Sequence, residues 1–232
     1  MSKTVNINKL HIKSNEITLL DLCFKIEETT ALIGESGSGK SLTLKALLNL
    51  LPTNLYKEFL YDSPFELNYE NIGFIPQNPF TSLSPMTKIE NQFFCDKKRK
   101  IDVLKKVGLN TWVLNRFPNQ LSGGQLQRVV IAIAISKNIK LLLLDEPTTA
   151  LDEQSKKLII ELIRQLATQL NLTLLFVTHD IDSIKDLCKK IIIIKNGKVI
   201  EEGKTSQILS NPKKQYTKTL IESNFKTREF RK

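Results

Sequence analysis

The chain lacks the features that mark membrane-spanning and secreted proteins. Its longest apolar runs, such as residues 129–135, are far shorter than the roughly 20 residues that a helix needs to cross a bilayer. Residues 1–13 contain no uninterrupted apolar core of the kind found in a signal peptide. Cys23, Cys95 and Cys188 have unrelated spacings, which indicate neither a metal site nor a disulfide framework and favour a reducing compartment. Any role at a membrane is therefore expected to be peripheral.

The composition fits a soluble globular protein with a basic surface. A length of 232 residues suffices for one sizeable core, or for one domain with an inserted subdomain. Lysine and arginine outnumber aspartate and glutamate by 34 to 24, which gives a net charge of +10. Such a surface can attract nucleic acid, anionic lipid or polyphosphate, but lysine-rich faces often serve only solubility. The basic run Lys97-Lys98-Arg99-Lys100 has no interleaved aromatic residue, and no nucleic-acid partner is expected.

Strand and helix patterns alternate along the chain, which predicts an α/β fold with a mainly parallel sheet. Thr29–Ile33 has the pattern of a buried strand, and leucines at helical spacing predict a helix from Lys40 that ends at Pro52. The pair Asn196-Gly197 between two β-prone runs predicts a type I′ hairpin. Further elements are predicted at residues 140–144 (strand), 153–169 (helix), 172–177 (strand), 191–194 (strand) and 198–201 (strand).

One segment interrupts this alternation. Residues 78–137 are mostly helical in pattern and contain Pro79, Pro85 and Pro118 as breaks. The sequence therefore predicts a single domain at residues 1–232. Its nucleotide-binding core comprises residues 1–77 and 138–232, and an inserted helical subdomain occupies about 78–137.

The first chemical motif is Gly34-Glu35-Ser36-Gly37-Ser38-Gly39-Lys40-Ser41, followed by Leu42, which has the pattern of a P-loop. Glycines let backbone N–H groups converge on phosphates, and the start of the helix adds partial positive charge. Lys40 can reach the β- and γ-phosphates, and the Ser41 hydroxyl can bind Mg²⁺. A glycine-rich turn alone is usually only a turn, but the lysine–serine pair between a strand and a helix favours nucleotide binding.

The second motif places two acids after the apolar residues 141–144. Asp145 and Glu146 would lie at the carboxyl edge of a sheet, where α/β proteins bind ligands. Asp145 would hold Mg²⁺, directly or through water, and Glu146 would polarise the water that attacks the γ-phosphate. The alternative, two acids that cap the next helix, is less favoured in a chain with a P-loop.

The third motif is Leu121-Ser122-Gly123-Gly124-Gln125, directly before a predicted helix. A glycine pair at a helix N-terminus can present Ser122 and backbone N–H groups to a phosphate. The alternative is that Ser122 caps only its own helix.

Together the motifs resemble the ABC ATPase family over nearly the whole chain. Their order is Walker A at residues 34–41, the Q-loop Gln77, the signature at residues 121–125, Walker B at residues 141–146, the D-loop Ala150-Leu151-Asp152 and the switch His179. The resemblance implies an α/β P-loop NTPase (RecA-like) core with a mainly parallel sheet, a small antiparallel β region and an inserted α-helical subdomain.

The resemblance also implies a mechanism of ATP hydrolysis with Mg²⁺. Glu146 would be the base, His179 would contact the γ-phosphate, and Gln77 would sense Mg²⁺ and water. Lys40 would act on the phosphates, and Ser41, Gln77 and Asp145 would form the Mg²⁺ site. In this family two heads enclose two ATP molecules, so Ser122 would contact the ATP bound by a partner.

Finer features resemble the peptide and nickel importers, nickel-import ATPases in particular. The run Gln77-Asn78-Pro79-Phe80-Thr81-Ser82-Leu83-Ser84-Pro85 is typical of their Q-loop region. This resemblance implies a peripheral subunit on the cytoplasmic face of the cell membrane, with two permease subunits and, indirectly, a substrate-binding protein. A second, different ATPase chain is favoured over a homodimer. The alternatives are a soluble ABC ATPase, as in metallocluster assembly, and the ATPase of an exporter or lipoprotein-release system.

One residue departs from the family pattern. Ser14 occupies the position where the family usually stacks adenine on an aromatic side chain, and His11 is a candidate substitute.

Overall fold

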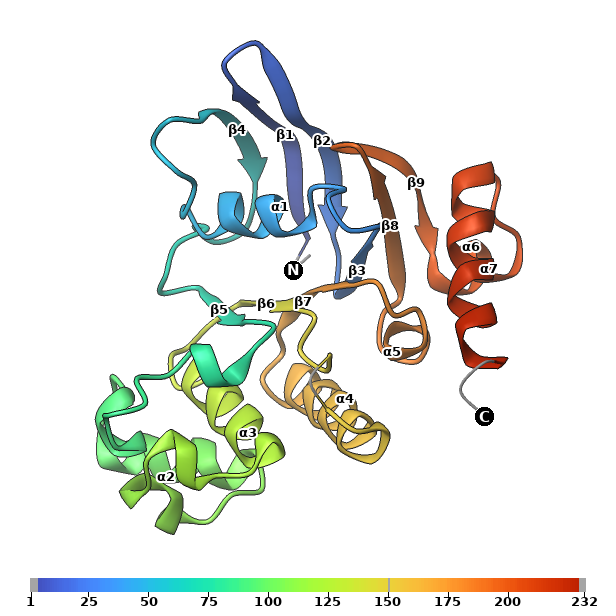
Figure 1. Ribbon diagram of the computed structural model, residues 1–232. Coiled ribbons are helices and arrows are strands. Elements are labelled where there is room, and N and C mark those ends of the chain that lie inside the picture. Colours follow the sequence, from blue (N-terminus) through green and yellow to red (C-terminus); the bar gives the residue numbers. More distant parts are fainter. Residues whose placement is uncertain (1–3, 150, 230–232) are drawn as a thin grey trace. The chain divides into compact units, whose positions relative to one another are not determined.

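The computed structural model describes residues 4–149 and 151–229, which belong to two compact units (Figure 1). The first unit comprises Met1–Asn68 and Thr173–Lys232, and the second comprises Tyr69–Leu172. The predicted division was different: a core and a helical subdomain at about 78–137. This division stays a prediction. Among the described residues, no helix combines the length and the apolar character needed to cross a bilayer.

The described strands of the first unit form a mixed sheet, in the order β4-β1-β2-β9-β8-β3-β7. Strand β3 pairs in parallel with β7 and β8, and β2 with β9, whereas β1 pairs antiparallel with β2 and β4. The strands are β1 (Val5–Ser14), β2 (Ile17–Ile26), β3 (Thr29–Ile33), β4 (Tyr56–Asp62), β7 (Thr173–Thr178), β8 (Lys190–Lys195) and β9 (Lys198–Lys204). All six residues of β7 are buried, as near-continuous apolar strands of covered parallel sheets are.

The described residues of this unit also form the helices α1 (Lys40–Leu47), α5 (Asp182–Lys185), α6 (Thr205–Ser210) and α7 (Gln215–Glu229). Helices α6 and α7 contact β9, as Figure 1 shows in red beside the last strand. Helix α1 ends at Leu47, about one turn before the predicted end at Pro52, because Asn49 adopts a left-handed φ of 55°. The predicted extent of this helix was therefore too long.

The predicted hairpin is confirmed. Strands β8 and β9 pair antiparallel, with Lys195 opposite Lys198 and two residues between them. Asn196 and Gly197 have φ values of 48° and 72°, as a type I′ turn requires at both central positions. A Cβ atom on Gly197 would lie 2.1 Å from the carbonyl oxygen of Leu19, so no other residue fits without a shift of the backbone.

In its described residues, the second unit contains the parallel strand pair β5 (Ile72–Ile75) and β6 (Leu141–Asp145) and three α-helices. The helices are α2 (Lys97–Lys106), α3 (Gly123–Ala134) and α4 (Glu153–Gln169). Residues 78–137 are helical as predicted, but in short pieces, because prolines begin two of the 3-10 turns. These turns are η1 (Pro79–Thr81), η2 (Ile89–Gln92), η3 (Thr111–Asn115) and η4 (Pro118–Gln120).

Candidate functional site

The P-loop, residues 34–41, joins the end of β3 to the start of α1. The Lys40 side chain folds back over this loop, and its Nζ donates hydrogen bonds to the carbonyl oxygens of Gly34 at 2.7 Å and Glu35 at 2.9 Å. Lys40 is only 8% exposed, which is unusual for lysine and indicates a structural constraint on its ammonium group. The loop therefore holds its cation in place rather than releasing it to solvent.

Gly39 is the residue that lets this loop turn into the helix. Its φ is 109°, and a Cβ atom would lie 2.4 Å from Cδ2 of Leu20. As N-cap of α1 it supplies no side-chain acceptor, and the first turn holds no acidic residue. The partial positive charge at the start of the helix is thus not offset by an acidic side chain of its first turn, which suits an anion. This is the arrangement that phosphate binding requires.

His179 follows β7 in the same unit. Because β3 and β7 pair in parallel with Ile33 opposite Thr178, Gly34 and His179 each lie one residue beyond the same edge of the sheet. The His179 side chain is exposed. The turn after it is held by Asp180, whose carboxylate accepts hydrogen bonds from the Asp182 N–H at 3.0 Å and the Ser183 hydroxyl at 2.7 Å. The first unit thus places the P-loop and His179 on one edge.

In the second unit, the ends of β5 and β6 carry Gln77 and the two acids. Ile75 pairs with Leu144 in parallel register, so Gln77 beyond β5, Asp145 at the end of β6 and Glu146 directly after it lie at one edge. The Gln77 Nε2 donates a hydrogen bond to the Glu146 Oε2 at 3.1 Å. The structure therefore brings two of the predicted catalytic residues into direct contact.

Glu146 adopts a backbone conformation that is rare for its residue type. Its φ is 44°, in the left-handed region that non-glycine residues seldom occupy. Such a conformation costs about 1–3 kcal/mol and occurs preferentially at functional sites. The half-buried side chain also accepts a hydrogen bond from the Thr149 hydroxyl, at 3.1 Å from the same Oε2 atom. The sequence reasoning missed Thr149, although a hydroxyl three residues after an acid is a common local hydrogen-bonding pattern.

The signature segment, residues 121–125, begins α3. The Ser122 hydroxyl accepts a hydrogen bond from the Gln125 N–H at 3.3 Å, and the Gln125 Oε1 accepts one from the Ser122 N–H at 3.0 Å. This capping box leaves the N–H groups of Gly123 and Gly124 in the first turn without a helical partner. Leu121 is buried and Ser122 is exposed, so the apolar residue anchors the turn that presents the serine.

Asp152 of the D-loop is the N-cap of α4. Its Oδ1 accepts hydrogen bonds from the N–H groups of Gln154 at 3.1 Å and Ser155 at 3.0 Å. The Ser155 side chain and these N–H groups hold the pKa of Asp152 below its ordinary value, so it stays ionised at neutral pH. Ala150, the first residue of this motif, lies outside the described residues.

Ser14, at the adenine position, and His11, the candidate substitute, both lie on β1. Ser14 is the last residue of β1. The His11 side chain is 17% exposed, and its Nδ1 lies 3.4 Å from the Asp21 Oδ1 on the neighbouring strand β2. A role of His11 toward adenine stays a prediction.

An apolar hollow of about 380 Å³ lies in the second unit, beside the Q-loop segment. Its walls come from Phe74 and Pro76 at the end of β5, from residues 81–83, and from Val130, Ile133 and Ala134 of α3.

A protein-family model described as "ABC transporter" matches residues 17–149. The chain is 35% identical to the oligopeptide transport ATP-binding protein OppD of Bacillus subtilis (strain 168), over 84% of this chain and 63% of that protein. It is 36% identical to the methionine import ATP-binding protein MetN 1 of Oceanobacillus iheyensis, over 95% of this chain and 71% of that protein. The chain thus spans less than two thirds of the OppD relative's length.

A solved structure has the same fold. It is that of cbiO1 from Clostridium perfringens, described as part of the ABC transporter complex cbiONQ. The TM-score is 0.78, and the match covers 99% of this chain and 98% of that one. At 24% sequence identity this likeness shows the fold alone, and it confirms the predicted α/β architecture with parallel and antiparallel regions.

Proposed function

The chain belongs to the ABC transporter family, and from that premise we propose that it binds and hydrolyses ATP as the motor subunit of an importer. The family resemblance predicted from the motifs is confirmed. The relatives reported above are named for oligopeptides and methionine, and neither is named for nickel. Short peptides are therefore the favoured cargo class, with nickel and metal chelates as the other candidates.

The observation that carries the proposal is the contact between Gln77 and Glu146 at the end of β6. In the proposed reaction Glu146 accepts a proton from water, the water oxygen bonds to the γ-phosphorus, and the bond to the β,γ-bridging oxygen breaks to release ADP and phosphate. The Glu146 Oε2 accepts hydrogen bonds from Gln77 and Thr149, and these two bonds orient the carboxylate. Lys40 stabilises the charge on the phosphates, and His179 contacts the γ-phosphate.

The donor set of the predicted Mg²⁺ ligands fits that ion. A serine hydroxyl (Ser41), an amide oxygen (Gln77) and a carboxylate (Asp145) are the hard oxygen ligands that Mg²⁺ prefers, alongside water and phosphate. When bound, Mg²⁺ neutralises part of the charge on the β- and γ-phosphates. The role of this chain would be to hold the ion through those three side chains.

Two heads are proposed to close over two ATP molecules. The capping box of α3 fixes Ser122 at a helix N-terminus whose glycine N–H groups suit a phosphate, which supports a role toward the ATP of a partner head. We expect the partner to be a second, different ATPase chain. Asp152, held ionised at the start of α4, belongs to the same proposed interface.

The importer assignment adds two permease subunits and, through them, a substrate-binding protein. The apolar hollow lined by the residues that follow β5 and by α3 would receive a short permease helix, since an apolar groove suits the apolar face of a helix. The subunit would then lie at the cytoplasmic face of the membrane without entering it.

Glu146→Gln tests the hydrolysis step, because glutamine keeps the shape of the side chain but cannot accept the proton. The variant should bind ATP as the wild type does and lose nearly all turnover in the assembled complex. Lys40→Ala, by contrast, should lose ATP binding. Near-wild-type hydrolysis by Glu146→Gln would remove Glu146 from the base role.

Purification from detergent extracts tests the importer assignment. We expect the chain to be recovered with membrane proteins and with a second ATPase. Recovery without any membrane protein would contradict transport and favour a soluble ABC ATPase. Uptake assays with short peptides and with nickel in cells that lack this chain would then identify the cargo.

A further inference from the structure

Tyr216, the second residue of α7, reaches the P-loop from the C-terminal part of the first unit. Its hydroxyl oxygen accepts a hydrogen bond from the backbone N–H of Glu35, at 3.2 Å. Glu35 is the second residue of the P-loop, directly after Gly34, and its carbonyl oxygen accepts the bond from Lys40 described above. One peptide segment of the phosphate-binding loop is thus tied to the last helix of the chain across 181 residues of sequence.

Hydrogen bonds and burial hold the start of α7 in place, and with it the backbone of Tyr216. The Glu201 carboxylate on β9 accepts hydrogen bonds from the N–H groups of Lys213 at 2.8 Å and Lys214 at 3.1 Å, just before the helix begins. Thr217 and Leu220 are buried. The backbone that carries Tyr216 can therefore not move away from the loop without loss of these contacts.

A cation also lies against the ring. The Nζ of Lys195, the last residue of β8, is 4.4 Å from the centre of the Tyr216 ring, within the range of a cation–π interaction. The hairpin that follows Lys195 contacts the loop as well, because the Gly197 N–H donates to the carbonyl oxygen of Ser38 at 3.0 Å. Burial raises the pKa of the Tyr216 phenol, so the group stays neutral at physiological pH.

We propose that Tyr216 is a positioning residue that holds the P-loop in its phosphate-binding shape, so that the docking of α7 sets the affinity for ATP. The proposal rests on the proposed function. A loop that is already ordered loses less conformational entropy when it binds a ligand. The Glu35 N–H would otherwise have to find another acceptor or leave the peptide plane free to rotate.

A purely structural role for Tyr216 predicts a different outcome from this one. If the ring only packs α7 onto the sheet, Tyr216→Phe keeps the ring and its contact with Lys195, and nucleotide affinity does not change. If the hydroxyl positions the loop, the same substitution weakens ATP binding. Tyr216→Phe, which removes only the hydroxyl group, therefore distinguishes the two roles.

The experiment measures the dissociation constant of a fluorescent ATP analogue, with Mg²⁺, for the wild-type chain and for Tyr216→Phe. One net hydrogen bond corresponds to a loss of affinity of about 2- to 10-fold, which we expect for Tyr216→Phe. In the assembled complex the KM for ATP should rise by the same factor, and kcat at saturating ATP should not change. Tyr61→Phe on the edge strand β4 is the matched control and should bind as the wild type does.

Tyr216→Leu provides a second variant, which removes the ring as well as the hydroxyl. It should bind ATP no more tightly than Tyr216→Phe. Equal affinity of Tyr216→Phe and wild type, with or without a lower melting temperature, would overturn the positioning role. A wild-type chain that binds no ATP would instead refute the proposed function, so the two failures are distinguishable.

Discussion

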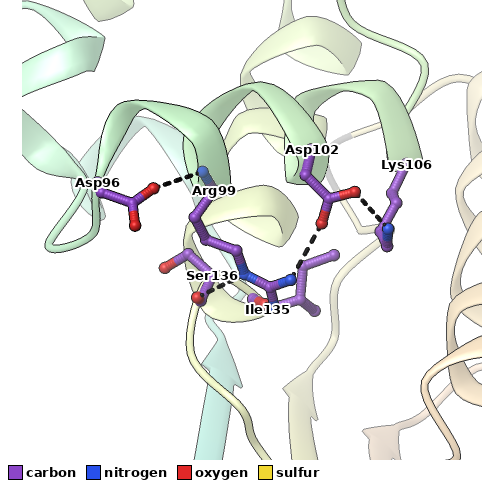
Figure 2. A network of polar contacts seen from close by, with 6 residues as sticks. All are labelled: Asp96, Arg99, Asp102, Lys106, Ile135 and Ser136. Carbon is purple, nitrogen blue, oxygen red and sulfur yellow. Dashed lines mark hydrogen bonds and ion pairs between the residues drawn. The ribbon is translucent and has the colours of Figure 1, made fainter.

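Replacing Arg99 by methionine should destabilise the second unit by about 2–3 kcal/mol, because this side chain joins α2 to the end of α3. Figure 2 shows its guanidinium group between the two helices. Nε donates to the carbonyl oxygen of Ser136 at 2.9 Å, and Nη2 donates to that of Ile135 at 2.9 Å. Both carbonyls lie just beyond the last residue of α3, where carbonyl groups receive no hydrogen bond from an N–H donor of the helix itself.

The magnitude follows from what methionine cannot replace. A hydrogen bond with a charged donor contributes about 1.5–3 kcal/mol, and the two are not additive because water can reach part of the site. The positive charge at the C-terminus of a helix adds about 0.3–1 kcal/mol. Asp102 accepts a hydrogen bond from Nη1 at 3.0 Å and keeps its second partner, Lys106, at 2.6 Å. The free energy lost through the contact with Asp102 is therefore smaller. Methionine retains most of the packing of the aliphatic stem.

Urea denaturation followed by tryptophan fluorescence is the assay. Trp112 is the only tryptophan of the chain and belongs to η3 in the second unit, so its signal reports on that unit. With a slope of about 1–3 kcal/mol per molar urea, the midpoint should fall by about 1 M. Lys98→Met, at an exposed position one residue earlier on α2, is the control. Equal midpoints for the two variants would refute the account of how α3 ends.

Three further predictions concern pH, the hairpin and the signature. Hydrogen bonding to Lys106, with the nearby Arg99, holds the pKa of Asp102 below its ordinary value. The ionised Asp102 therefore contributes its full stabilisation to the folded state above the ordinary pKa. This contribution is lost as pH falls through the lower pKa of the folded state. The stability difference between wild type and Asp102→Asn, measured by denaturation, should vanish in acid; a constant difference would contradict this sign. Gly197→Ala should destabilise the first unit by about 2 kcal/mol or more, whereas Gly108→Ala, also at positive φ but without a backbone clash, should have a smaller effect in thermal melts. Ser122→Arg should still bind ATP at its own P-loop but prevent ATP-driven association with a partner head, as size-exclusion chromatography would detect; normal association would contradict the two-head arrangement.

The parts of the fold that could be predicted are those where residue chemistry leaves few choices. Thr29–Ile33 combines β-branched and apolar residues that favour a buried strand, and it forms β3 with the predicted bounds. Asn196 and Gly197 are the residues that tolerate the two left-handed positions of a type I′ turn, and the hairpin forms there. The helix predicted at residues 153–169 matches α4, because Asp152 caps its start.

What could not be predicted depends on tertiary contacts. Strand β4 was missed because its residues, Tyr56 to Asp62, mix Lys57 and Glu58 with aromatics at an edge where one side faces solvent. The left-handed φ of Glu146 cannot be read from its residue type, and without it the contact from Thr149 is not apparent. The hydrogen bond between Glu35 and Tyr216 requires knowledge of where α7 docks.

The central claim is that Glu146 activates the water that cleaves ATP bound at the P-loop. Its most direct test is the identity of the nucleotide that the assembled complex retains after a single turnover with radiolabelled ATP and Mg²⁺. The wild type should yield ADP, and Glu146→Gln should yield intact ATP in the same amount. Recovery of ADP from both at similar rates would contradict the account.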